Sequence, residues 1–125
     1  MNDALIYTGS TIIIIWGMAH LFPTREIIKG FGDISSDNKK ILAMELLTEG
    51  ITLIFLGVLA IIVTAAGEPS SLTAHIVFYT EASMLLVMAL VTTFTGARTP
   101  VFWYKLCPAV KTIVAAFFVL GSVLK

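Results

Sequence analysis

The sequence predicts an all-α protein, a four-helix up-down-up-down transmembrane bundle that forms a single integral membrane domain over residues 1–125. Three observations lead to this prediction. Of the 125 residues, 58% are hydrophobic and only 13% are charged, whereas a soluble domain has about 25% charged residues. A soluble chain of this length needs more charge than that to cover its surface. Long apolar stretches also recur along the chain, separated by short connections that contain Gly or Pro.

Four spans are predicted, and the first two are the clearest. No formal charge interrupts the chain between Asp3 and Arg25 or between Glu49 and Glu68. Each run is long enough to cross a hydrocarbon core of ~30 Å at ~1.5 Å per residue. The third apolar block contains one carboxylate and the fourth contains two lysines. The spans cover about residues 4–22, 41–66, 72–95 and 101–124.

The connections between the spans are residues 23–40, 67–71 and 96–100. In the first of them, Thr24 is expected to cap a short interfacial helix from Arg25 to Lys29 that ends at Gly30. Ser36 or Asp37 is then expected to cap the second long helix, which begins in the headgroup region about two turns before its lipid-buried part.

The basic residues predict the orientation, because cytoplasmic loops of membrane proteins are enriched in Lys and Arg. Connections 23–40 and 96–100 are therefore expected to face the cytoplasm, with both termini outside, in the cytoplasmic (inner) membrane of a prokaryote. Eight Lys and Arg residues balance eight Asp and Glu residues. The chain thus has no basic field for nucleic acid, which is excluded as a partner. The residues that set the orientation are Arg25, Lys29, Lys39, Lys40, Arg98 and Lys105 on one side, against Lys125 alone on the other.

A polar stripe follows one face of the second span. Glu45, Thr48, Glu49 and Thr52 recur at i, i+3, i+4 and i+7, which places them on one side of a helix. A carboxylate below the headgroups costs roughly 2.5–3.5 kcal/mol on insertion scales. We therefore expect this face to point into the bundle, with at least one carboxylate protonated, paired or bound to a ligand.

Trp16 and His20 are also four residues apart, near the cytoplasmic end of the first span and beside the start of the second helix. With Glu45 and Glu49 they are the candidate pocket. A histidine with carboxylates could act as an acid–base pair, move a proton or bind a divalent metal, so His20, Glu45 and Glu49 are both the catalytic and the metal candidates. No HExxH or ExxH spacing supports the metal. The structural alternative is that Glu45 lies at the interface and Glu49 pairs with His20 or a basic residue, which fixes helix register.

Glu81 and Lys111 lie near the middle of the third and fourth spans, on the order of 14 Å from their entry faces. One interpretation is a buried ion pair between them, in a possible pathway. In the other, Pro108 starts a shorter helix from Ala109 to Leu124, and Lys111 extends to the interface. Both interpretations stay open at this point. Cys107 is the only cysteine and, without an identified basic partner, is expected to be inert.

The end of the first span reads GMAHLFP from Gly17 to Pro23, an amphipathic connection follows, and Gly50 and Gly57 mark the second span. In this layout the chain resembles small four-span bacterial membrane proteins of the DoxX-like kind. The resemblance implies a four-helix fold and a membrane redox or accessory role, because some DoxX-like proteins are subunits of quinone-linked oxidoreductases. It assigns no functional residue.

Three functions fit these observations. The favoured one is an accessory or assembly subunit of a membrane system, whose buried polar residues dock a partner or fix the fold. The second is an oligomeric proton-coupled or ion-conducting transporter that uses Glu49 and Glu81. The third is a membrane enzyme acting on a quinone- or isoprenoid-like substrate, with His20, Glu45 and Glu49 as acid–base groups and Trp16 in the pocket. Membrane lipids, a second copy or another membrane protein are the expected partners. No cofactor is expected, with a divalent metal or a quinone as the alternatives.

Overall fold

A computed structural model describes residues 1–67 and 71–124, and this part of the chain contains helices and no strands. Four of the helices are long and apolar enough to cross a membrane by length and composition, which confirms the predicted set of four. The predicted bounds agree with the observed ones to within a few residues, except that the second long helix starts at Ser36, ahead of the predicted span 41–66. The sequence predicted such an early start, and its location in the headgroup region stays a prediction. The elements are α1 (Asp3–Leu21), α2 (Thr24–Lys29), α3 (Ser36–Ala66), α4 (Leu72–Phe94), the 3-10 turn η1 (Gly96–Arg98) and α5 (Phe102–Val123).

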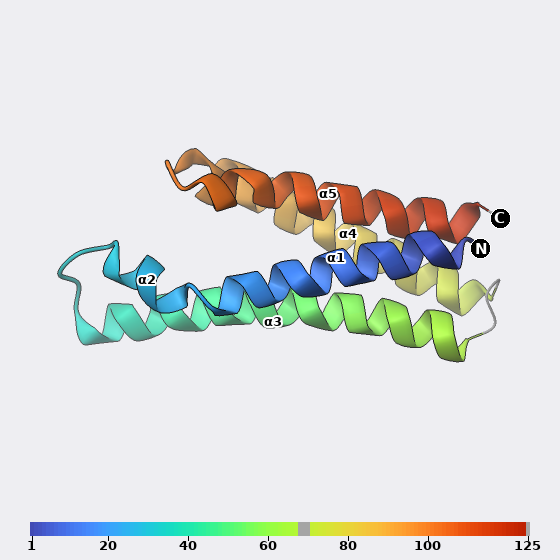
Figure 1. Cartoon of the computed structure of the whole chain (residues 1–125), viewed down its shortest axis with the longest axis horizontal. Coiled ribbons are helices and arrows are strands. Elements are labelled where there is room, and N and C mark those ends of the chain that lie inside the picture. The colour runs from blue at the N-terminus through green and yellow to red at the C-terminus, as the bar shows by residue number, and fades with distance from the viewer. Residues whose placement is uncertain (68–70, 125) are drawn as a thin grey trace.

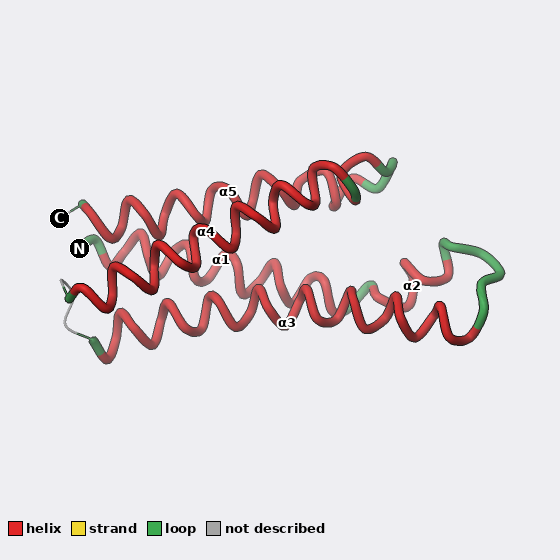
Figure 2. Tube along the Cα trace, turned by 180° about the vertical axis from the view of Figure 1, so that it is seen from behind, coloured by secondary structure: helices red, strands yellow, loops and turns green. Residues whose placement is uncertain are grey.

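The four long helices form two pairs, α1 with α3 and α4 with α5, and the two pairs come together at one end of the molecule (Figure 1 and Figure 2). Both termini lie at that end, and α2 and η1 lie at the other (Figure 1). Helix α3 packs along α1, and α4 packs along α5, while α5 also contacts α1. Helix α3 has little contact with α4. The two pairs draw apart toward the end that holds α2 (Figure 2), and this end contains the candidate site.

The short helix α2 ends at Gly30 as predicted, but Thr24 does not cap it. Thr24 is the first residue of the helix, and its hydroxyl donates to the carbonyl of His20 at 3.2 Å. The reason is that Pro23 occupies the cap position, so Thr24 is already helical and lacks the extended backbone that is typical of a cap residue. The prediction that Ser36 or Asp37 caps the second long helix was wrong, because both residues lie inside α3. The cap is Ser35, whose hydroxyl accepts from the N–H of Asn38 at 3.1 Å.

Glycines set the distance between α1 and α3. A Cβ atom on Gly17 would lie 2.7 Å from the carbonyl oxygen of Gly50, and one on Gly57 would lie 2.8 Å from the carbonyl oxygen of Ser10. Such contacts are shorter than those that a Cβ atom tolerates, so only glycine allows the two backbones to approach this closely. The close packing fixes which residues of α1 and α3 face each other near His20.

Helix α5 continues through Pro108, so the alternative in which the helix starts at Ala109 does not hold. Because proline has no N–H group, the carbonyl of Tyr104 loses its usual intrahelical donor. At the opposite end of the bundle, Nδ1 of His75 on α4 lies 2.5 Å from the hydroxyl of Ser122 on α5, which links these two helices.

Candidate functional site

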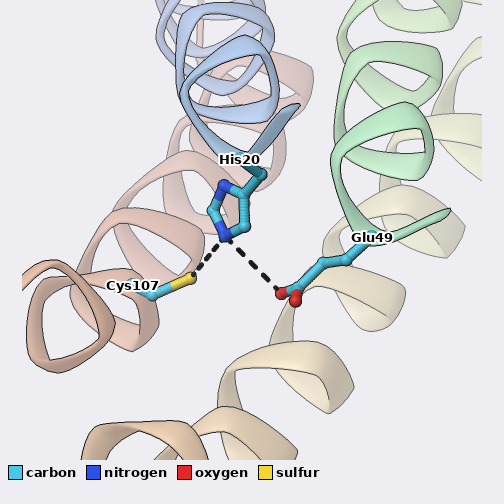
Figure 3. A group of neighbouring side chains, drawn as sticks. All are labelled: His20, Glu49 and Cys107. Carbon is cyan, nitrogen blue, oxygen red and sulfur yellow. Dashed lines mark hydrogen bonds and ion pairs between the residues drawn. The ribbon is translucent and has the colours of Figure 1, made fainter. Parts of the chain in front are cut away.

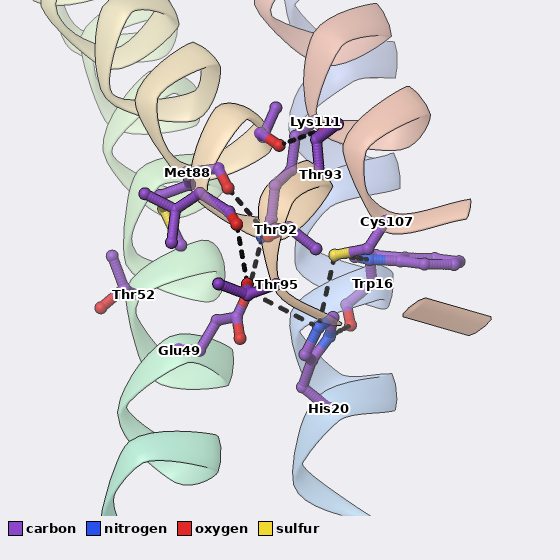
Figure 4. A network of polar contacts seen from close by, with 12 residues as sticks. Trp16, His20, Glu49, Thr52, Met88, Thr92, Thr93, Thr95, Cys107 and Lys111 are labelled. Carbon is purple, nitrogen blue, oxygen red and sulfur yellow. Dashed lines mark hydrogen bonds and ion pairs between the residues drawn. The ribbon is translucent and has the colours of Figure 1, made fainter. Parts of the chain in front are cut away.

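A fully buried lysine forms the centre of the site. Lys111 on α5 is 0% exposed. Its Nζ atom donates to Oε1 of Glu49 on α3 at 2.5 Å and to Oγ1 of Thr92 on α4 at 3.0 Å (Figure 4). An ammonium group away from water is tolerated only with a counterion and further hydrogen bonds. Glu49 and Thr92 supply both, and the contacts connect three helices.

Lys111 does not form the ion pair with Glu81 that the sequence suggested. Neither carboxylate oxygen of Glu81 has a hydrogen-bond partner within residues 1–67 and 71–124, although the residue is 3% exposed. The interfacial alternative fails as well, because Lys111 is buried inside the bundle. A helical side chain leans toward the N-terminus of its helix, and α5 begins at the end that holds α2 (Figure 1). Lys111 therefore extends away from Glu81, which lies about 16 Å from Thr92 along α4 at ~1.5 Å per residue.

The unpartnered Glu81 leads to a first prediction. Glu81→Met keeps a side chain of similar length and removes a polar group whose unmet hydrogen bonds cost about 1–3 kcal/mol. We expect the variant to raise the melting temperature of the protein in detergent micelles. Combined with Lys111→Met, its effect should add to that of the second change, because the two side chains are not in contact. A lower melting temperature for Glu81→Met, or a strongly non-additive effect in the double variant, would contradict the structure, in which Lys111 pairs with Glu49 and not with Glu81.

His20 lies beside the ion pair and is held in one orientation. Its Nδ1–H donates to the carbonyl of Trp16 at 2.8 Å, which leaves the lone pair of Nε2 directed into the site. Nε2 lies 3.6 Å from Sγ of Cys107 and 3.9 Å from Oε1 of Glu49 (Figure 3). The indole N–H of Trp16 donates to the same sulfur at 3.4 Å. Each of these side chains therefore contacts at least one of the others. We call His20, Glu49, Cys107 and Lys111, with Trp16 and Thr92 beside them, the polar cluster.

The structure brings together only part of the predicted set. Trp16, His20 and Glu49 share the site, and Glu45 and Thr48 are exposed on α3. The hydroxyl of Thr52 donates to the carbonyl of Thr48 in the same helix rather than to the site. The buried face of α3 is formed by Gly50, Leu53, Leu56, Gly57, Ala60 and Thr64. Glu49 is at the edge of this face, and the rest of the polar stripe turns outward.

Sequence reasoning missed Cys107 and Thr92. Cys107 is 1% exposed and lies between Trp16 and His20, so the basic partner that the sequence did not identify is His20. One signal was present, because Cys107 and Lys111 are four residues apart and therefore share a face of α5. Trp16 and His20 are a second pair spaced four residues apart, on α1, at the same end of the bundle as Cys107 and Lys111.

Two hollows flank the cluster. The aromatic hollow has a volume of about 240 Å³ and is lined by α1, α2 and the start of α5, including Trp16, Ala19, His20, Ile27, Trp103 and Tyr104. The methionine hollow has a volume of about 320 Å³, and its lining includes Glu49, Met84, Met88, Thr92, Thr95 and Tyr104. His20 thus reaches one hollow and Glu49 the other.

Compared with known proteins, the chain matches no family model, no curated protein and no solved structure.

The cluster offers two kinds of chemistry. It combines a thiol, an imidazole, a carboxylate and an ammonium group, so it can hold or transfer protons next to an apolar hollow. One ligand atom each from His20, Glu49 and Cys107 also lies within 4.8 Å of the others, which is a spacing that suits a metal ion.

Proposed function

We propose that the protein is an integral membrane protein that binds a lipid-soluble, quinone- or isoprenoid-like molecule in the aromatic hollow, with the polar cluster as its reacting groups. The observation that carries the proposal is that His20 is shared: its ring lines the hollow and its Nε2 faces Cys107 and Glu49. An apolar cavity with a few convergent polar groups is the usual form of a small-molecule site. A membrane enzyme of this kind is the third of the functions expected from the sequence.

The lining of the hollow suits a flat ring with an apolar tail. Trp16 and Trp103 lie edge to face with ring centroids 6.4 Å apart, and aromatic walls favour planar ligands. Trp103 is 66% exposed, so a tail can pass from the hollow into the surrounding lipid. The polar end of the ligand would then lie against His20 and the phenol of Tyr104. The DoxX-like resemblance expected from the sequence implies a membrane redox or accessory role, and a redox role is consistent with a quinone.

The membrane topology belongs to this proposal. The connections that contain most Lys and Arg residues lie at the end opposite the termini (Figure 1). With an up-down-up-down bundle in the cytoplasmic membrane of a prokaryote, the aromatic hollow is at the cytoplasmic side, where Trp and Tyr residues favour the interface. Partner docking by an accessory subunit, oligomerisation and transport through Glu49 and Glu81 stay predictions.

The two tryptophans give a direct test. They are the only two in the chain, and both line the hollow, so the fluorescence of the protein reports on this site. We expect a benzoquinone with a decyl tail to quench this fluorescence saturably in detergent or nanodiscs. Decanol, which has the tail without the ring, should not compete at the same concentration.

Filling the hollow gives the matched comparison. Ala19→Phe places a ring in the hollow and should weaken quinone binding by at least about tenfold, which corresponds to ~1.4 kcal/mol. Ala116→Phe adds the same ring at an exposed position of α5 outside both hollows and should leave binding unchanged. Quenching that rises linearly with quinone, or that is equal in both variants, would refute the proposed site.

A further inference from the structure

We propose that His20, Glu49 and Cys107 hold a thiophilic divalent metal ion such as Zn²⁺. The three side chains come from α1, α3 and α5 and point toward one position (Figure 3). The distance between Sγ of Cys107 and Nε2 of His20 is 3.6 Å. Bonds of about 2.3 Å to sulfur and about 2.0 Å to nitrogen at a tetrahedral angle separate the two ligand atoms by about 3.5 Å. This pair therefore already has the spacing of zinc ligands.

Glu49 completes the set when its carboxylate moves toward His20 and Cys107, since the three ligand atoms now lie within 4.8 Å of one another. Its Oε1 is 3.9 Å from Nε2 of His20, and a tetrahedral zinc site would bring these atoms to about 3.3 Å. The same Oε1 atom accepts from Lys111, and a carboxylate oxygen has two lone pairs, so one lone pair can accept this hydrogen bond while the other binds the metal. Lys111 then holds the carboxylate in place and does not exclude the cation.

Each of the three proposed ligands also has a hydrogen bond to a residue outside the ligand set, and this bond would orient the side chain toward the metal. Nδ1–H of His20 donates to the carbonyl of Trp16, and the indole N–H of Trp16 donates to the sulfur of Cys107. Lys111 donates to Glu49. Metal-binding histidines almost always donate their other N–H to a carbonyl or carboxylate, and such partners orient the metal ligands. The cluster has this arrangement for all three.

The donor set selects the class of metal. A thiolate and an imidazole favour Zn²⁺ and similar transition metals over Mg²⁺ and Ca²⁺, which prefer oxygen ligands. When the metal binds, the Cys107 S–H bond breaks, sulfur keeps the electron pair and bonds to the metal, and the proton leaves to the buffer.

The net charge of the site indicates which kind of fourth ligand it would bind. The dication, the Cys107 thiolate, the Glu49 carboxylate and the Lys111 ammonium leave one net positive charge in a buried site. A hydroxide or an anionic substrate oxygen at the fourth position cancels it, which a low-dielectric environment favours. Three protein ligands with one open position are typical of catalytic zinc sites.

Co²⁺ is the probe for this site, because a tetrahedral cobalt–thiolate complex has visible bands and a near-ultraviolet sulfur-to-cobalt charge-transfer band. The protein should be purified without a histidine tag, treated with a chelator and titrated with Co²⁺. We expect one Co²⁺ per chain, the charge-transfer band, and loss of both on addition of Zn²⁺. Cys107 is the only cysteine, so the band can come from no other residue.

Variants separate the ligands from their neighbours. Cys107→Ser should abolish the charge-transfer band and lower Co²⁺ affinity by at least about 100-fold, the upper end of the loss seen when only an orienting partner is removed. Glu45→Gln, exposed one turn before Glu49, should leave the spectrum unchanged. Circular dichroism and melting temperature check that Cys107→Ser is folded. Absence of the charge-transfer band in the wild-type protein, or an equal band in Cys107→Ser, would overturn the proposal.

This metal site goes beyond the proposed binding of a lipid-soluble molecule and does not depend on it. The cobalt experiment contains no quinone, and the fluorescence experiment contains no metal. Each can therefore fail while the other succeeds.

Discussion

Glu49→Gln is expected to destabilise the protein more than Lys111→Met, although each change removes one partner of the same ion pair. The Lys111 side chain is 0% exposed, whereas that of Glu49 is 28% exposed. Glu49→Gln leaves an ammonium group inside the bundle without a counterion, and breaking a buried pair in this way costs about 3–5 kcal/mol. Lys111→Met leaves a carboxylate that lines the methionine hollow, so we expect a smaller loss of roughly 1–3 kcal/mol.

Unfolding of the purified protein in mixed detergent micelles measures both changes. The double variant Glu49→Gln/Lys111→Met should recover much of the loss, because no buried charge is left alone. Glu45→Gln is the control on the same helix and should change the free energy of unfolding by less than about 0.5 kcal/mol. Equal losses in the two single variants, or strictly additive losses in the double variant, would contradict the buried pair.

Gly17→Ala is expected to separate α1 from α3 and to disturb the site one turn away. The new Cβ would lie 2.7 Å from the carbonyl oxygen of Gly50, a backbone atom that cannot turn aside as a side chain can. Forcing extra volume into such a contact costs about 1–3 kcal/mol. Because His20 follows Gly17 on α1 and Glu49 precedes Gly50 on α3, the same movement should increase the distance between these two site residues.

The measurements are the free energy of unfolding and, for the site, the affinity for Co²⁺. Gly96→Ala is the control, since its Cβ would meet Tyr104 no closer than 3.4 Å, an ordinary contact. We expect Gly96→Ala to behave as wild type and Gly17→Ala to lose both stability and metal affinity. A stable Gly17→Ala variant would mean that α1 and α3 do not pack through these glycines.

The sequence was sufficient to predict the helices, because uncharged runs and the thickness of a bilayer define their lengths. It also placed Trp16 and His20 near Glu49, since a short connection brings the end of one helix to the start of the next. The partner of Lys111 could not be predicted in this way. Periodicity shows that Cys107 and Lys111 share a face of α5, but not how α5 is rotated in the bundle.

The polar stripe on α3 shows the same limit. Residues at i, i+4 and i+7 share one side of a helix, yet the buried face of α3 is rotated around the helix from the stripe and includes small residues such as Gly50 and Gly57. Glu49 falls at its edge, and Glu45 falls outside it. The position of a packing face depends on the neighbouring helix, which a single sequence does not specify.

The separation of the helices into two pairs has a consequence for how the molecule is built. His20 and Glu49 belong to the first half of the chain, and Cys107 and Lys111 belong to the second. In each half the two long helices pack mainly on each other, so the helices of each half can associate before the two halves meet. Either half alone then has a charge in its interior face with no counterion. Joining the halves therefore pairs Glu49 with Lys111 and brings His20 to Cys107, so the same contact between the halves neutralises both charges and creates the cluster.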